Sequence, residues 1–246
     1  MNSLRGKTVL ITGGAKRIGR EIALRLASAG ADIAITYLSS QREAQRTTVD
    51  VSSRSVRCVS LRCDLRDEDE IRKTLKEVIR ELGRLDVLIN NAGLYETLEF
   101  EKITIAQWDN MFATNARAPY LVSRAAAAEL RRHNGRIINL GSLGGLRPWV
   151  NHAHYCASKA ALEMLNRLMA KALAPGIAVN CVAPGMIHLG EKKPPSAFMK
   201  KLAEKTPMKR NGTAADVAEA VLFFATAPHF ITGQTLVVDG GLGLVS

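Results

Sequence analysis

Tyr155 and Lys159, four positions apart, are the residues with the clearest chemistry. On a helix this spacing places the phenol and the ammonium on the same face. A phenol titrates near 10, so acid–base work at neutral pH needs roughly 4 kcal/mol of extra stabilisation of the phenolate, which a nearby cation can supply. Ser142 follows a strand-like run at 136–140, where loop hydroxyls can bind substrate. A surface Tyr and Lys on an ordinary amphipathic helix would have the same spacing, so other features must decide.

Composition indicates a globular protein. The chain has 246 residues, of which 47% are hydrophobic and 23% are charged. It has no run of eighteen apolar residues, and its first residues lack the apolar stretch and cleavage site of a signal peptide. Its four cysteines match no paired metal-ligand spacing and are too few for a disulfide scaffold. We therefore expect free thiols in a reducing cytoplasm, no membrane association and no bound metal.

The formal net charge of +11 raises the question of an acidic partner. The basic residues are spread along the chain, and their short clusters lack the interleaved aromatic residues of a nucleic-acid surface. We predict no nucleic-acid binding and expect the charge to attract a phosphate-bearing cofactor. His152 and His154 lack acidic or cysteine partners nearby in the sequence, so we interpret them as loop residues and not as metal ligands.

The first forty residues have the pattern of a dinucleotide site. An apolar run at 8–11 leads into a turn with Gly13, Gly14 and Gly19 and then into a helical pattern, the context in which backbone N–H groups hold a diphosphate. The spacing differs from GxGxxG, so this motif alone is weak. After a second strand at 32–36 there is no acidic residue to bind a ribose 2′-hydroxyl.

Hydroxyl and basic side chains occupy that place. Ser39 and Ser40, with Arg17 and Arg42 expected nearby, favour a 2′-phosphate, so we predict NADP(H) as the cofactor. An ordinary solvated loop is the alternative interpretation of the same residues.

Strand-like and helical patterns alternate along the whole chain. Strands are predicted at 8–11, 32–36, 56–61, 85–89, 136–140, 177–182 and 235–238, and further helices at 68–82, 104–130, 155–174 and 214–225. Such alternation predicts an α/β fold: a single doubly wound (Rossmann) domain over 1–246 with a seven-stranded, mainly parallel sheet. The long segment at 186–207 is predicted to be a substrate loop or lid.

Together these features resemble the short-chain dehydrogenase/reductase family over essentially the whole chain. The matching segments are Thr12-Gly13 to Gly19, Asp64, Asn90 to Gly93, Asn115, Ser142, Tyr155 with Lys159, Pro184-Gly185 and Asp239 to Gly241. The resemblance implies that Ser142 positions the substrate oxygen and that Tyr155 exchanges its proton. It also implies that Lys159 binds the nicotinamide ribose and lowers the tyrosine pKa, and that Asn115 belongs to a water-linked proton relay ending at the lysine.

The resemblance also implies which residues bind the cofactor and how chains associate. The expected cofactor-binding residues are Gly13, Lys16, Arg17, Ile18, Tyr37, Ser39, Ser40, Asp64, Leu65, Asn91, Ala92, Gly93, Tyr155, Lys159, Pro184, Gly185 and Ile187. Asp64 is expected at the adenine edge. A homotetramer is expected, with interface area from the helix at 120–130 and from the apolar stripe Ala157, Ala161, Leu165 and Leu168.

The substrate is where the motifs diverge. Arg17, in place of the usual middle glycine, and Tyr95, two residues after the Asn-Asn-Ala-Gly turn, are similar to the pteridine reductase branch, where such residues contact the pterin. Ser142 is instead what ordinary carbonyl reductases use. Our leading expectation is a pteridine reductase-like activity with Arg17, Tyr95, Ser142 and Tyr155 at the substrate. The alternatives are a reductase of 3-oxoacyl thioesters or other small ketones, and a non-catalytic NADP(H)-binding regulator.

Overall fold

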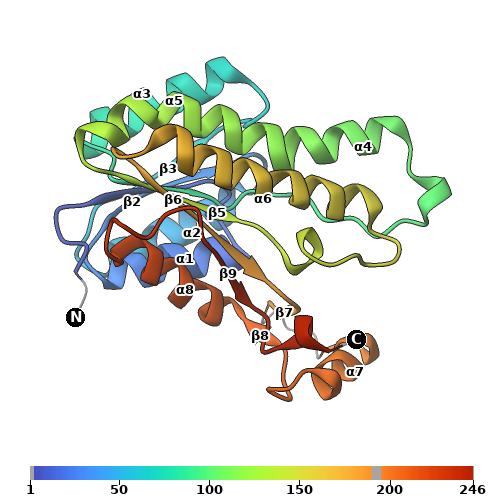
Figure 1. The fold of residues 1–246 in the computed structure, drawn as a ribbon. Helices are drawn as coiled ribbons and strands as arrows, with labels where there is room; N and C mark the ends of the chain where they lie inside the picture. Colours follow the sequence, from blue (N-terminus) through green and yellow to red (C-terminus); the bar gives the residue numbers. More distant parts are fainter. Residues whose placement is uncertain (1–2, 190–194, 246) are drawn as a thin grey trace.

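Seven parallel strands form the central sheet of the computed structural model, which describes residues 3–189 and 195–245 (Figure 1). The strands are β1 Thr8–Ile11, β2 Asp32–Tyr37, β3 Cys58–Arg62, β4 Val87–Asn90, β5 Arg136–Leu140, β6 Ala178–Pro184 and β9 Thr235–Val238. Their order is β3-β2-β1-β4-β5-β6-β9, and every neighbouring pair is parallel. The predicted doubly wound α/β domain with seven strands is therefore confirmed.

Helices cover both faces of this sheet (Figure 1). On one face lie α1 Arg17–Ser28, α2 Gln41–Ser52 and α8 Ala214–Thr226; on the other lie α3 Glu68–Leu82, α5 Ala118–Arg132 and α6 Ala153–Leu173. Side chains alternate between the two layers along each strand, so Val9 and Ile11 pack toward α1 while Leu10 packs toward α3 and α5. Burial on both faces explains the unbroken apolar runs of the strands.

The order of the strands reverses between β1 and β4. Parallel strands on the two sides of such a switch point send their following loops apart, which opens a crevice at their carboxyl ends. The turn after β1 and the turn after β4, which carry the glycine and Asn-Asn-Ala-Gly motifs, both border this crevice.

The helix predicted over 104–130 is interrupted. It consists of α4 Ile105–Phe112, a π-helical segment Ala113–Arg117 and α5. Thr104 and Gln107 form a reciprocal capping box that fixes where α4 begins. The π-helical segment, Ala-Thr-Asn-Ala-Arg, contains neither glycine nor proline, so no local signal in the sequence marks the interruption.

Smaller elements complete the described chain. They are the 3₁₀ helices Phe100–Lys102, Leu143–Gly145 and Leu242–Leu244, the short strands β7 Ile187–His188 and β8 Gly212–Thr213, and α7 Ala197–Lys205. β7 and β8 pair in a separate two-stranded sheet close to α7 (Figure 1). The predicted substrate loop at 186–207 thus holds β7 and α7, while its residues 190–194 lie outside the described residues. Its role as a lid stays a prediction.

Three features are absent from the part of the chain that the structure describes: membrane-spanning helices, metal-binding clusters and disulfides. None of its helices is long and apolar enough to cross a membrane. Its histidine, cysteine, aspartate and glutamate side chains form no group of three or more that could hold a metal ion. The cysteines Cys58, Cys63, Cys156 and Cys181 are all free.

Candidate active site

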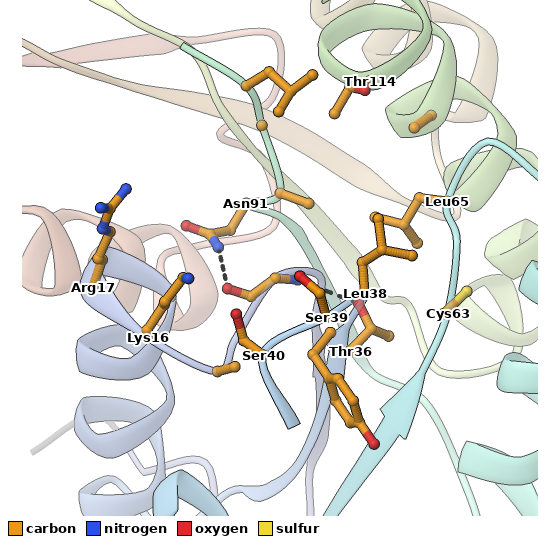
Figure 2. A pocket seen from close by; sticks show the side chains of 18 of the residues that line it. Lys16, Arg17, Thr36, Leu38, Ser39, Ser40, Cys63, Leu65, Asn91 and Thr114 are labelled. Atoms are coloured by element: carbon orange, nitrogen blue, oxygen red, sulfur yellow. Dashed lines mark hydrogen bonds between the residues drawn. The ribbon is translucent and has the colours of Figure 1, made fainter. Parts of the chain in front are cut away.

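Two adjoining cavities open at the carboxyl ends of the strands. The larger, of about 620 Å³, runs from the turn after β1 past the ends of β2 and β3 to the turn after β4 (Figure 2). Twelve of the predicted cofactor residues line it: Gly13, Lys16, Arg17, Ile18, Tyr37, Ser39, Ser40, Asp64, Leu65, Asn91, Ala92 and Gly93. Residues from four separate strand ends are therefore brought to one groove.

The glycine turn brings backbone against backbone. Gly13 has a φ of +64°, which glycine adopts without strain. A Cβ atom at Gly19 would lie 2.4 Å from the Gly13 carbonyl oxygen, so a side chain there would push the turn apart. Helix α1 begins after Lys16 without a side-chain cap and with no acidic residue in its first turn. Its first N–H groups, together with Lys16 and Arg17, make this end of the groove suitable for an anion.

The loop after β2 carries hydroxyl groups at the place where a carboxylate would repel a ribose 2′-phosphate. Ser39 and Ser40 line the groove, and Ser40 precedes α2 without capping it through its side chain. Figure 2 shows Lys16 and Arg17 on one side of the groove, with Ser39 and Ser40 between them and Leu65. Arg42, which we expected nearby, is exposed on α2 and is not among the lining residues.

Asp64 has a partner that the sequence motif did not reveal. Arg66 donates from Nε to Oδ1 at 2.9 Å and from Nη2 to Oδ2 at 2.7 Å, and these bonds lower the pKa of Asp64 to about 2. The same guanidinium donates to Asn110 Oδ1 of α4 at 3.0 Å. Arg66 and Asn110 both line the groove, so they join the expected adenine-binding residues Asp64 and Leu65 there. The arginine two positions after Asp64 is the only local signal for this contact.

The second cavity, of about 340 Å³, contains the residues with acid–base chemistry. Its lining includes the predicted residues Arg17, Tyr95, Ser142, Tyr155, Lys159, Pro184, Gly185 and Ile187. It also includes Trp149, His152 and Met186, which were not predicted as site residues. Arg17, Ile18, Asn91, Gly93, Leu94 and Leu189 line both cavities, so the two are continuous.

Burial dominates the protonation of Tyr155. It raises the pKa of the phenol, while a hydrogen bond with Ser142 lowers it. We expected Lys159 to lower the tyrosine pKa, but the Lys159 ammonium instead donates to the Leu140 carbonyl oxygen at 2.6 Å. Burial also lowers the pKa of Lys159, to about 8. In the free protein the phenol is therefore held in its protonated form more strongly than an exposed tyrosine.

Asn115 lies beside this cavity and not in its lining. It is completely buried within the π-helical segment. Its Oδ1 accepts from the Leu94 N–H at 2.8 Å, and its Nδ2 donates to the Leu94 carbonyl at 3.0 Å and to Ser158 Oγ at 3.0 Å. A Cβ atom at Gly93 would lie 3.2 Å from this Oδ1 and 3.6 Å from Lys159 Nζ, so both groups border Gly93. Asn115 thus fixes the main chain of the loop after β4.

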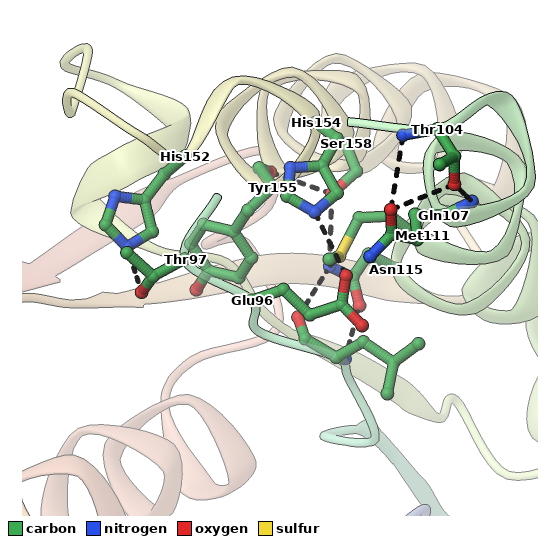
Figure 3. A network of polar contacts seen from close by, with 11 residues as sticks. Glu96, Thr97, Thr104, Gln107, Met111, Asn115, His152, His154, Tyr155 and Ser158 are labelled. Atoms are coloured by element: carbon green, nitrogen blue, oxygen red, sulfur yellow. Dashed lines mark hydrogen bonds and ion pairs between the residues drawn. The ribbon is translucent and has the colours of Figure 1, made fainter. Parts of the chain in front are cut away.

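Two histidines fasten that loop to the start of α6 (Figure 3). His152 donates from Nδ1 to the Val150 carbonyl at 2.7 Å, so its Nε2 can accept from the hydroxyls of Tyr95 at 2.7 Å and Thr97 at 3.0 Å. His154, completely buried, lies with Nε2 3.3 Å from a carboxylate oxygen of Glu96. We interpreted both histidines as plain loop residues; the structure places His152 in the wall of the cavity.

Tyr95 is held between two rings. Its ring stacks on His152 at a centroid distance of 5.0 Å and an interplanar angle of 28°, and it meets Tyr155 edge to face at 85°. His152 and Tyr155 both pack against Tyr95, so less of its ring surface is left for a flat ligand.

Comparison with known proteins gives a consistent family. Residues 13–243 match the family model described as enoyl-(acyl carrier protein) reductase. The 3-oxoacyl-(acyl-carrier-protein) reductase FabG of Staphylococcus epidermidis is 34% identical over 240 residues, which cover 96% of this chain and 98% of that protein.

Solved structures agree over the same extent. A short-chain dehydrogenase from Burkholderia cenocepacia in complex with NADP has a TM-score of 0.90 and 35% identity, covering 98% of this chain and 99% of that chain. A blue fluorescent protein from a metagenomic library in complex with NADPH has a TM-score of 0.91 and 33% identity, covering 98% of this chain and 99% of that chain.

The buried lysine should be visible in the pH dependence of stability. Its pKa is lowered from 10.5 to about 8 in the folded protein, so between these values the unfolded chain binds more protons and stability rises with pH. The free energy of unfolding of the wild type, minus that of Lys159→Met, should rise by about 1 kcal/mol between pH 8 and pH 9. Urea unfolding across this range measures it. A flat difference would contradict the burial of a titrating ammonium.

Proposed function

Because this chain belongs to the short-chain dehydrogenase/reductase family, we propose that it reduces a carbonyl group with NADPH as the reductant. The observation that carries the proposal is that Ser142, Tyr155 and Lys159 line one cavity, continuous with a groove suited to a dinucleotide. A non-catalytic regulator that only bound the cofactor would need no proton donor at this place.

The groove fits NADP(H) by its chemistry. The Gly13 and Gly19 approach leaves no room for a Cβ atom, and the start of α1 presents N–H groups to a diphosphate. Ser39 and Ser40 stand where a 2′-phosphate would lie, with the cations Lys16 and Arg17 on the adjoining side of the groove and no carboxylate on that loop to repel it. When bound, the nicotinamide supplies a hydride from C4. The four free cysteines fit a reducing cytoplasm.

The chain's own residues supply the proton and the polar contacts. Tyr155 donates its phenolic proton to the substrate oxygen, and its raised pKa keeps that proton in place until the transfer. Ser142 hydrogen-bonds the same oxygen and orients it toward the phenol. The Lys159 ammonium lines the same cavity and supplies a positive charge there. Asn115 holds the Gly93–Leu94 main chain beside Lys159, which keeps the wall between the two cavities in position.

We place a 3-oxoacyl thioester or another small ketone first as the substrate. Ser142 suits a C=O group, because a neutral hydroxyl can donate to the developing alkoxide. The sequence led us to expect a pterin, and Arg17 and Tyr95 do line the cavity. However, the relatives compared give that expectation no support, and His152 packs against Tyr95. A pterin is therefore the second candidate.

Parallel assays of NADPH oxidation separate these substrates. An acetoacetyl thioester, a panel of simple ketones and dihydrobiopterin are supplied to the wild type and to Tyr155→Phe. We expect turnover of the thioester or of a ketone, and a loss of at least about 100-fold in Tyr155→Phe with NADPH binding retained. Turnover of the pterin alone would reverse our order of substrates. Undiminished activity in Tyr155→Phe would refute the proton-donor role.

Cofactor choice is tested by fluorescence titration. NADPH should bind at least about tenfold more tightly than NADH, a preference of roughly 1.4 kcal/mol or more. Lys16→Gln and Arg17→Gln should reduce the preference, whereas Arg46→Gln, an exposed change on α2 outside the groove, should not. Added salt should also reduce it, because exposed cations are screened. Equal dissociation constants for the two cofactors would contradict the 2′-phosphate site.

We further propose a homotetramer. Most of the apolar residues expected at its interface on α5 are buried within the single chain, including Leu121, Ala126 and Leu130. The support comes from large apolar side chains that stay exposed on neighbouring helix surfaces: Tyr120 on α5 and Met164 and Leu168 on α6.

Light scattering tests this assembly. The wild type should have four times the chain mass of 26.7 kDa, and Leu168→Glu should give smaller species. Val49→Glu, an exposed apolar position on α2, is the control and should not change the mass. A monomeric wild type at micromolar concentration would refute the assembly.

A further inference from the structure

A carboxylate is buried directly behind Lys159. Glu163, one helical turn later on α6, is only 4% exposed. Its Oε1 accepts from Cys181 Sγ of β6 at 3.1 Å, and its Oε2 accepts from Thr235 Oγ1 of β9 at 2.7 Å. A glutamate is almost never buried to this extent unless its charge is paired. Both hydrogen bonds come from neutral groups, so the charge requires another partner.

The end of β5 brings the two charged groups together. Lys159 Nζ donates to the carbonyl of Leu140, and the very next residue is Gly141. A Cβ atom at Gly141 would lie 2.3 Å from Glu163 Oε1 and 2.7 Å from Cys181 Sγ. The ammonium and the carboxylate therefore contact consecutive residues of one strand end. The residue after them is Ser142, whose hydroxyl faces the substrate cavity.

The titratable groups around Lys159 also support Glu163 as its partner. Burial lowers the pKa of this lysine, and the titratable groups that oppose the effect are Cys181 on β6 and Glu163 on α6 itself. Burial also raises the pKa of Cys181 well above its usual value, so this thiol stays protonated and donates to Glu163. Of the two groups, the Glu163 carboxylate is therefore the one that can provide a counter-charge for the buried ammonium.

We propose that Glu163 is a positioning residue of this reductase, the buried counter-charge that keeps Lys159 an ammonium and holds the strand end from which Ser142 projects. The proposal rests on the proposed function, because only there does Lys159 serve the reaction. The carboxylate acts through Lys159 and Gly141 and touches neither the substrate nor the cofactor.

A pH-resolved double-mutant cycle tests the counter-charge without any substrate. The difference in unfolding free energy between the wild type and Lys159→Met begins to rise near pH 8, where the lysine loses its proton. The same difference is measured between Glu163→Gln and the double variant Lys159→Met/Glu163→Gln. We expect its rise to begin at least about one pH unit lower. An unchanged onset would overturn the proposal.

Thr235→Val is the matched control. It removes one hydrogen bond to Glu163 Oε2 and alters the packing of the same cluster, but it leaves the carboxylate in place. We expect a displacement of the onset less than half of that caused by Glu163→Gln. An equal displacement would mean that the cluster acts through packing and not through charge, and would overturn the proposal.

Failure of Glu163→Gln to fold would also be informative. Without its counter-charge the buried ammonium should be what destabilises the variant, so removing Lys159 as well should restore folding in the double variant. A double variant that is equally unfolded would overturn the proposal.

The turnover of the proposed reductase gives the second readout. In the wild type, kcat for NADPH-dependent reduction of the best substrate should fall as the pH rises and Lys159 loses its proton. In Glu163→Gln this fall should begin at lower pH, displaced by the same number of pH units as the rise in the stability difference. KM should change little. A fall in kcat by one factor at every pH would indicate a merely structural role and overturn the proposal. If the wild type reduced no substrate at all, the proposed function would fail while the stability cycle still decided the role of Glu163.

Discussion

A buried ammonium is the constraint around which the carboxyl ends of this sheet are arranged. Removing the Lys159 charge from water is costly unless polar groups replace its hydration. The Leu140 carbonyl does so directly at 2.6 Å, and Glu163 contributes a negative charge one turn along the same helix. The Lys159 ammonium and the Glu163 carboxylate thus both reach the end of β5 from α6, and the residues at that strand end must leave room for them.

The buried polar groups also explain why glycines occupy positions 141 and 93 next to Lys159 in space. Gly141 leaves room for the Glu163 carboxylate, and Gly93 leaves room for the Asn115 amide and the lysine amine. Each is the residue at which a strand end passes a buried polar group without a side chain of its own. Motif glycines at these positions are thus explained by close approach of neighbouring polar atoms, and not by backbone conformation, since neither has a positive φ.

Local signals made much of the fold predictable. The helix predicted at 68–82 has the bounds of α3, where the Asp67 side chain accepts from the N–H groups of Asp69 and Glu70 and Gly83 follows the last residue at a φ of +84°. The strands at 8–11, 136–140 and 235–238 were predicted because each is a short β-rich apolar run between turns. Helix α2 was missed, because its largely polar sequence carries only a weak apolar stripe.

The site residues also differ in whether a local sequence pattern could predict them. Tyr155 and Lys159 were found because they lie only four positions apart on one helix. Arg66 and His152 were missed because the contacts that define them reach Asn110 and Tyr95, more than forty positions away. Such contacts depend on which loops the sheet order brings together, which a local pattern does not contain.

The π-helical segment is the last element that the site requires. One extra residue in a turn rotates everything after it by about 100° relative to a regular helix. Here the π-helical segment lies between α4, which packs against α6, and α5, which packs against the sheet. The face that α5 buries therefore need not continue the face that α4 buries. Asn115 sits in that segment and bonds both main-chain groups of Leu94, which lines both cavities. The π-helical segment therefore carries the residue that holds the main chain of Leu94, where the cofactor groove and the substrate cavity adjoin.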